Sequence, residues 1–185
     1  REDFEKGFRE VVEQMFPESE YRLRRLTADH PIYRSEYLLD AETAELWGVD
    51  VGCRTSIVYS PNDYSCLWDK WMVAPPKNRP PQMTQRINKA LSVGTNIVAY
   101  VTGRDPPSKI ERQDLPVAQQ LKDEVERGQI QIAKIKHEGN WDVAPEAVGN
   151  LLAALNAVGG MSASPEKFSR TLTDPDLQNF PIIYM

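Results

Sequence analysis

Residues 129–135 read Gln-Ile-Gln-Ile-Ala-Lys-Ile, and this stretch decides the fold class of the 185-residue chain. Its opening alternation and its β-branched residues predict a β-strand. A polar loop follows, and Pro145 then opens a segment whose apolar stripe predicts a helix ending at glycines 159 and 160. The stripe consists of Val148, Leu151, Leu152, Leu155 and Val158. Strand, loop and helix are half of a βαβ unit, so the sequence predicts a three-layer α/β fold with a mostly parallel sheet flanked by helices.

The segments around this unit extend the same pattern. Residues 116–127 predict a helix with a charged polar face, and residues 169–172 predict a further strand. The chain closes on Phe-Pro-Ile-Ile-Tyr-Met at 180–185, an apolar run typical of a buried parallel strand. Such a strand needs neighbours on both sides, so we expect the domain to be incomplete in this chain.

The part of the chain before residue 104 contains both helical and strand patterns. Apolar residues recur at helical spacing in two segments, of which the first is stopped by Pro17 and the second by Gly103. Alternating segments separated by turn residues predict strands, and a proline-rich stretch predicts a loop. The predicted helices cover 3–15 and 84–101, the predicted strands 21–26, 46–51 and 56–59, and the predicted loop 60–82.

Residues 104–114 mark the expected boundary. They are polar, charged and proline-bearing, which is the composition of a linker. We therefore expect half of one α/β unit over 1–103 and half of a second over 115–185.

Charge and composition exclude several classes of function. The chain has 22 Lys and Arg against 27 Asp and Glu, a net charge of -5, and no basic stripe, so no nucleic-acid partner is predicted. No apolar run reaches the roughly 18 residues of a membrane span, and no signal peptide is recognisable. Because the chain starts at Arg1, we expect a longer precursor, which leaves a cytoplasmic and an exported location both open. Cys53 and Cys66 lack the spacing of a zinc site, and neither metal nor cofactor is predicted.

The loop at 137–142, His-Glu-Gly-Asn-Trp-Asp, is the first candidate site. It lies at the carboxyl end of a predicted strand and before a helix, where doubly wound folds bind ligands. His137, Asn140, Trp141 and Asp142 are its candidate ligand-binding residues. The alternative is structural: Asp142 caps the helix, Trp141 anchors the loop to the core, and the glycine at 139 supplies a positive φ.

The second candidate site is the turn at 59–66, Tyr-Ser-Pro-Asn-Asp-Tyr-Ser-Cys, which also follows a predicted strand. Its candidate binding residues are Asn62, Asp63 and Cys66. A serine or cysteine nucleophile would need a nearby base, and no nucleophile-elbow pattern surrounds either residue type here. The alternative is a turn closed by the side chains of Asn62 and Asp63.

His30, in the sequence Asp-His-Pro, is the third candidate, because a histidine at a strand end can titrate near neutral pH. The alternative is a histidine that bonds to the backbone and orders the turn. The aromatic residues Tyr64, Trp68 and Trp71 in the predicted loop could stack on a ligand or cover a sheet edge.

Several motifs together resemble a bacterial family known as domain of unknown function 4159. The resemblance rests on Phe-Arg and Phe-Pro at 8–9 and 16–17, on Leu-x-x-x-His-Pro-Ile at 26–32, and on Ser-Pro-x-Asp-x-x-Cys within 60–66. It continues in the helix around 94–100. The family looks like a relative of class I glutamine amidotransferase-like and trehalose-utilisation-like domains, which implies a flavodoxin-like fold.

The remaining family features come in reversed order. Features of the family's first half appear at 132–141, 150–152, 174–177 and 180–185, after those of its second half. We interpret this order as the end of one copy followed by the start of another, and a circular permutation is the alternative. The family's Gly-rich turn and long helix after the Tyr-Met strand are absent.

Three functions follow from these observations. The first is a non-catalytic ligand-binding or interaction module of a larger protein, because the amidotransferase-type cysteine elbow is missing. The second is a hydrolase-like enzyme that uses His30 or His137 with Asp63 or Cys66. The third is a structural or assembly domain, in which an unpaired strand edge is covered by a partner or by a second copy in a homo-oligomer. The expected partner is a small molecule or a protein, and no catalytic residue or substrate is predicted.

Overall fold

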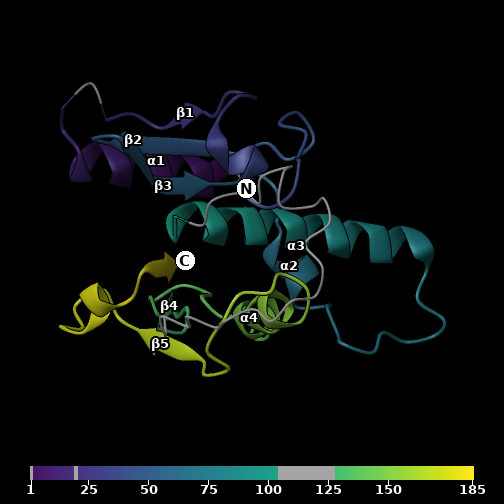
Figure 1. Cartoon of the computed structure of the whole chain (residues 1–185). Coiled ribbons are helices and arrows are strands. Elements are labelled where there is room, and N and C mark those ends of the chain that lie inside the picture. The colour runs from purple at the N-terminus through teal and green to yellow at the C-terminus, as the bar shows by residue number, and fades with distance from the viewer. Residues whose placement is uncertain (1, 19–20, 104–127) are drawn as a thin grey trace, which may run out of the picture.

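The computed structural model describes residues 2–18, 21–103 and 128–185, and it has a mixed α/β architecture (Figure 1). The predicted linker at 104–114 and the predicted helix at 116–127 lie outside the described residues. Two small sheets, one on each side of this gap in the sequence, pack with four α-helices. The predicted α/β class is thereby confirmed.

The first sheet is antiparallel and has the order β1-β2-β3. It contains β1 (Arg24–Arg25), β2 (Trp47–Val51) and β3 (Arg54–Tyr59). Gly52, at φ 63°, makes the tight turn between β2 and β3, and these two strands confirm the strands predicted at 46–51 and 56–59. A mostly parallel sheet is therefore not formed here, because a connection this short allows only antiparallel neighbours.

Helices cover both faces of this sheet. On one face lies α1 (Glu2–Met15), whose Phe8 ring stacks on Tyr59 with ring centroids 5.2 Å apart and whose Val12 is buried beside Val49. On the other face lie the short helix η1 (Pro31–Arg34) and α3 (Pro81–Val101). The two long helices predicted in this part of the chain are confirmed.

The second sheet is parallel, with the order β5-β4-β6. It contains β4 (Ile132–Ile135), β5 (Phe168–Arg170) and β6 (Ile182–Tyr184). Between β4 and β5 the chain forms α4 (Ala147–Ala157), which confirms the predicted βαβ unit. A further short helix, η2 (Leu177–Asn179), precedes β6. The expectation that the last strand is buried is wrong: Ile183 is 48% exposed, because β6 is an edge strand.

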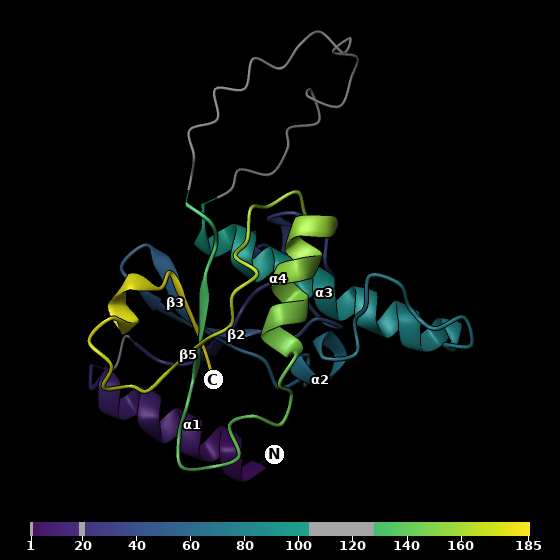
Figure 2. The ribbon, with the colours of Figure 1, turned by 90° about the horizontal axis from the view of Figure 1, so that it is seen from below.

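Helix α3 connects the two parts of the molecule. It packs on η1 in one apolar cluster and on α4 in another, and Figure 2 shows α4 lying across α3. The predicted loop 60–82 is partly wrong, because it contains α2 (Ser65–Trp68), which packs against both α3 and α4. One apolar cluster therefore includes residues from both sides of the predicted boundary, among them Trp68, Leu91, Leu151 and Leu155.

None of the helices within residues 2–18, 21–103 and 128–185 combines the length and the apolar character that crossing a membrane requires.

Candidate functional site

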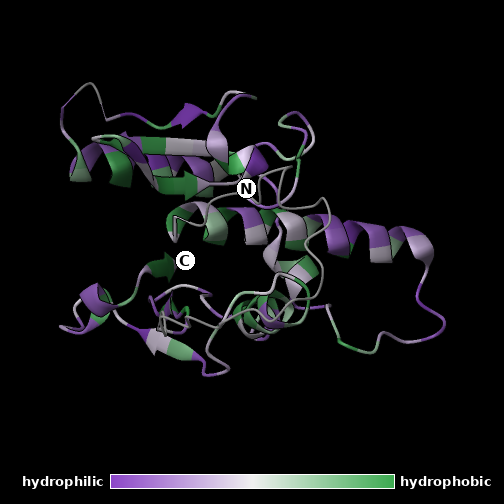
Figure 3. Ribbon diagram, viewed as in Figure 1, coloured by the Kyte–Doolittle hydropathy of each residue, from purple (hydrophilic) through white to green (hydrophobic). Residues whose placement is uncertain are grey.

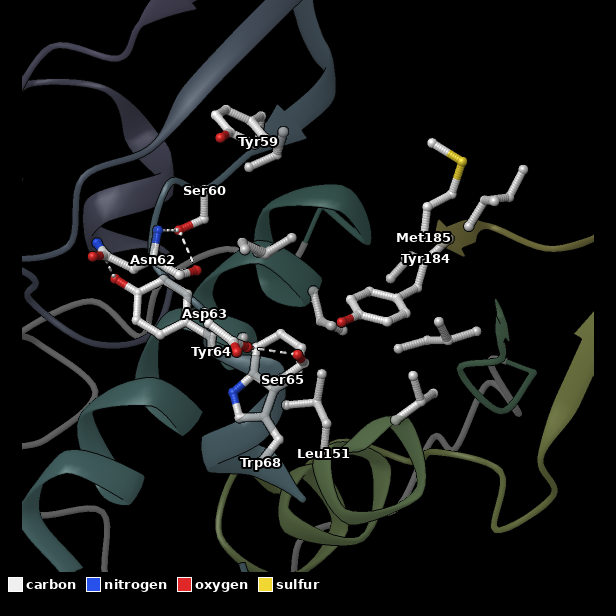
Figure 4. Close-up of a pocket in the computed structure, with 18 of the residues that line it drawn as sticks. Tyr59, Ser60, Asn62, Asp63, Tyr64, Ser65, Trp68, Leu151, Tyr184 and Met185 are labelled. Atoms are coloured by element: carbon white, nitrogen blue, oxygen red, sulfur yellow. Dashed lines mark hydrogen bonds between the residues drawn. The ribbon is translucent and has the colours of Figure 1, made fainter. Parts of the chain in front are cut away.

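A cavity of about 240 Å³ lies where the two parts of the molecule meet (Figure 4). Its polar rim is the turn after β3, and facing this rim are Tyr184 and Met185 at the end of the chain. Its floor is apolar and comes from α2, α3 and α4. Floor residues include Trp68, Gly94, Ile97, Val98, Val148 and Leu151.

The rim is shaped by side-chain hydrogen bonds within the turn. The Ser60 hydroxyl donates to the carbonyl of Asn62 at 3.1 Å and accepts from the Asn62 N–H at 3.0 Å. Asp63 accepts from the Ser65 hydroxyl at 2.7 Å and from the Cys66 N–H at 3.1 Å. The alternative interpretation of Asn62 and Asp63, a turn closed by side-chain and backbone bonds, agrees with these contacts for Asp63.

The floor depends on a glycine. A Cβ at position 94 would lie 2.7 Å from Leu151 and 2.9 Å from the Trp68 ring, closer than carbon atoms pack. The indole N–H of Trp68 donates to the carbonyl of Ala90 at 2.9 Å, which holds the ring in this position. The absence of a side chain at Gly94 therefore lets α2 and α4 reach α3.

Burial and hydrogen bonds set the charge of the rim. Burial alone would raise the pKa of Asp63, but hydrogen bonds from Cys66 and Ser65 outweigh it and lower that pKa. The pKa of the Cys66 thiol is raised, first by its hydrogen bond to Asp63 and then by burial. Burial also raises the pKa of the Tyr64 and Tyr184 phenols. At neutral pH the rim presents one carboxylate beside protonated hydroxyl and thiol groups.

His30 lies at the opposite end of β3. Its Nδ1 accepts the Ile32 N–H at 3.2 Å, so its Nε2 carries the proton in the neutral ring and donates to Thr55 Oγ1 at 3.0 Å. Thr55 in turn donates to Asp50 Oδ1 at 2.5 Å. Thr55 also donates its N–H to the Tyr100 hydroxyl at 3.1 Å. This chain of bonds matches the alternative in which His30 orders its turn.

The loop at 137–142 lies at the carboxyl end of β4. Asp142 pairs with the buried Lys134 at 2.7 Å, and Lys134 also donates to the carbonyl of Ala144 at 3.0 Å. The Lys134 ammonium lies 5.5 Å from the centre of the Trp141 ring. The expected cap is wrong, since α4 has no side-chain cap and Asp142 neutralises a lysine instead. The expected positive φ at Gly139 is also wrong, because the described glycines with positive φ are Gly52, Gly103 and Gly160.

One family model matches most of the chain. The model described as "Domain of unknown function (DUF4159)" matches residues 1–102 and 131–185. The chain belongs to this family. No curated protein and no solved structure matches it. The family prediction is thereby confirmed, whereas the amidotransferase-like fold and the tandem or permuted arrangement stay predictions.

In this DUF4159 chain the predicted site residues fall into three places. Asn62 and Asp63 line the cavity, with Cys66 beside them in α2. Trp141 and Asp142 line a separate cavity of about 250 Å³ around Lys134. The third place is the Thr55 end of β3, where His30 lies.

The two histidines and Asn140 lie away from the main cavity. His137 lies exposed in its loop, where its Nδ1 accepts the Gly139 N–H at 3.0 Å, and Asn140 is exposed too. His30 bonds to Ile32 and to Thr55 at the start of β3, whereas Asp63 and Cys66 follow the other end of this strand. Across the described parts of the chain, no group of three or more metal-ligating side chains occurs.

Sequence reasoning missed three residues of these sites. Tyr184 reaches the rim only because β6 pairs beside β4, and a tyrosine in a short apolar strand gives no earlier sign of this. For Gly94 the sequence indicates only a place within a helix. Lys134 did carry a signal, because a lone charge inside an otherwise apolar strand needs a buried partner.

Proposed function

We propose that this DUF4159 domain is a non-catalytic binding module of a larger protein and that its site is the cavity at the carboxyl end of β3. One observation carries the proposal: an apolar cavity with a polar rim lies between distant segments of the chain, and no histidine is among the described residues that line it. The floor supplies apolar surface for affinity, and the Asp63 carboxylate and the neighbouring hydroxyl groups orient what binds.

The finer fold prediction supports this placement. We propose that the two sheets are parts of one three-layer, amidotransferase-like α/β unit, with α3 and α4 as one helical layer. In such folds ligands bind at the carboxyl ends of the strands, and the rim turn of the cavity directly follows β3. The division at 104–114, the tandem copies and the permutation stay predictions.

The hydrolase alternative requires a histidine within hydrogen-bond reach of Asp63 or Cys66. His30 donates to Thr55, and His137 accepts from its own loop. The raised pKa of Cys66 also keeps its thiol protonated, whereas a cysteine nucleophile acts as a thiolate. The binding module is therefore the function we favour.

Titration with the neutral apolar dye Nile red tests the proposal. We expect saturable binding that Ile183→Asp weakens by about tenfold, because this side chain lines the cavity and a carboxylate there must be desolvated. Leu172→Asp is the matched control, since Leu172 is 67% exposed outside the cavity, and it should leave binding unchanged. Equal loss in both variants, or no saturable binding, contradicts the proposal.

A turnover assay separates the binding module from the hydrolase. With p-nitrophenyl acetate as the probe, we expect release of nitrophenol to be the same for the wild type, Cys66→Ala and His30→Gln. A loss of more than about tenfold in either variant favours the hydrolase.

A further inference from the structure

The cavity continues into a second one along β3. The second cavity has a volume of about 400 Å³ and is lined by Arg54, Thr55, Ser56 and Val58 of β3, by α3 and by residues 180–183. The two cavities share Val58, Ile97, Ile182 and Ile183. They form one channel, which we call the β3–β6 groove.

Two strand edges form the walls of this groove. Among the described strands, β3 pairs only with β2 and β6 pairs only with β4, so each turns its other edge toward the groove. Arg54 and Phe180 line one end of the groove, and Tyr59 and Met185 line the other. The two strands therefore run in the same direction, and a strand between them would be parallel to both.

The groove is apolar on two faces. Ile97 and Val98 of α3 lie on one face. On the other face Phe4, Ile183 and Met185 are 61%, 48% and 58% exposed. Figure 3 shows the arrow of β6, whose sequence is Ile-Ile-Tyr, in the green of hydrophobic residues next to the C-terminus. Such a sequence is typical of a strand buried on both faces, yet here it forms an exposed edge.

Charges differ between the two ends of the groove. The exposed Arg54 lies at the end where both strands begin, and the exposed Asp63 lies at the end where they finish. Consider a bound strand with an acidic residue before it and a basic residue after it. If it runs parallel to β3 and β6, its acidic residue lies near Arg54 and its basic residue near Asp63. In the antiparallel direction each residue would lie near a like charge.

We propose that the β3–β6 groove binds an extended segment of a separate polypeptide as a parallel β-strand, apolar on both faces, with an acidic residue before it and a basic residue after it. The inference rests on the proposed binding function and names its partner. A strand in this place would hydrogen-bond to β3 and β6 at the usual spacing of about 4.8 Å and join the two sheets into one.

Calorimetric titration with the peptide Asp-Val-Ile-Val-Phe-Val-Lys tests this inference. We expect saturable binding, together with slower amide exchange in β3 and β6. A second peptide has the same side chains but carries a methyl group on every other backbone nitrogen, which removes those N–H hydrogen-bond donors. Its binding should be at least about tenfold weaker.

A charge exchange tests the direction of the strand. Arg54→Glu should weaken binding of the first peptide by about threefold to tenfold and should strengthen binding of Lys-Val-Ile-Val-Phe-Val-Lys. Arg22→Glu, at an exposed position outside the groove, is the matched control and should change neither affinity.

The outcomes distinguish the inference from the function on which it rests. If Nile red binds but the peptide does not, or if the N-methylated peptide binds equally well, the strand inference fails and the binding module stands. If neither probe binds, both fail. A dimer of the chain that Ile183→Asp dissociates would show that a second copy fills the groove, which also overturns the inference.

Discussion

The two ends of β3 use polar side chains in opposite ways. At the start of the strand, His30, Thr55 and Asp50 bond to one another and to the backbone. At its carboxyl end, Asp63 and Ser65 bond to each other on the rim of an apolar cavity. One end is closed by its own contacts, whereas the other leaves a volume that a ligand can fill. The conspicuous motif around His30 thus lies at the end of β3 away from the cavity.

Asn96 should show the largest effect at the closed end. Its side chain is fully buried and donates to the carbonyls of Ile32 and Tyr37, and it accepts from the Tyr37 N–H at 2.8 Å. Asn96→Ala leaves these backbone groups unpaired and should lower the free energy of unfolding by about 3 to 5 kcal/mol in urea denaturation. Asn88→Ala, on the exposed side of the same helix, is the control and should change it by less than about 0.5 kcal/mol. Equal effects would show that the closed end is not held by Asn96.

Gly94 should show the next largest effect, at the cavity end. Gly94→Ala pushes a methyl group against Leu151 and Trp68 and should destabilise the chain by about 1 to 3 kcal/mol in the same assay. Gly7→Ala in α1 meets no atom within 4 Å and should stabilise the chain by about 0.5 kcal/mol, since alanine is the better helix former. A stabilising Gly94→Ala would contradict the tight packing behind the cavity.

A pH series should distinguish the two ends of β3. Burial lowers the pKa of His30 below its ordinary value of 6.5, so the unfolded chain takes up the proton first as the pH falls. The contribution of His30 to stability is therefore complete above pH 6.5 and is lost as the pH falls through its lower pKa in the folded chain. The free energy of unfolding should therefore differ less between pH 7.5 and pH 5.5 in His30→Gln than in the wild type. If His30→Gln and the wild type show the same difference, the pH effect does not come from His30.

The smallest effect should be chemical, at Cys66. Its hydrogen bond to Asp63 raises the pKa of the thiol, so alkylation by iodoacetamide at pH 8, followed by mass spectrometry, should be slower than at the exposed Cys53. Asp63→Asn removes the acceptor charge and should speed alkylation of Cys66 while leaving Cys53 as the internal control. A rate at Cys66 that does not respond to this substitution would show that Asp63 does not control the thiol.

Local patterns in the sequence predicted most of the helices and strands. The spacing of Ile87, Leu91 and Val98 predicted α3, and alternation around Gly52 predicted the β2–β3 hairpin. Helix α2 was missed because a single helical turn has no period to detect. The prediction that Asp142 caps the helix was wrong because its carboxylate pairs with the buried Lys134, whose charge needs a partner.

The sequence likewise predicted one part of the candidate site and not the other. The motif around residues 60–66 predicted where polar groups gather, and Asn62 and Asp63 do line the cavity. The motif could not predict that Tyr184 and Met185 would face these residues, since they come from the far end of the chain.

By itself, the sequence determined the family, the α/β class and the local elements, because side-chain periodicity and turn residues act over a few neighbouring positions. Only the tertiary structure decided which polar residues line a cavity and which form hydrogen bonds that hold the fold together. It placed β6 opposite β3 across α3, and it left both strand edges facing one apolar groove. The physical reason is that burial and hydrogen-bond satisfaction depend on what packs nearby in space, which local patterns do not specify.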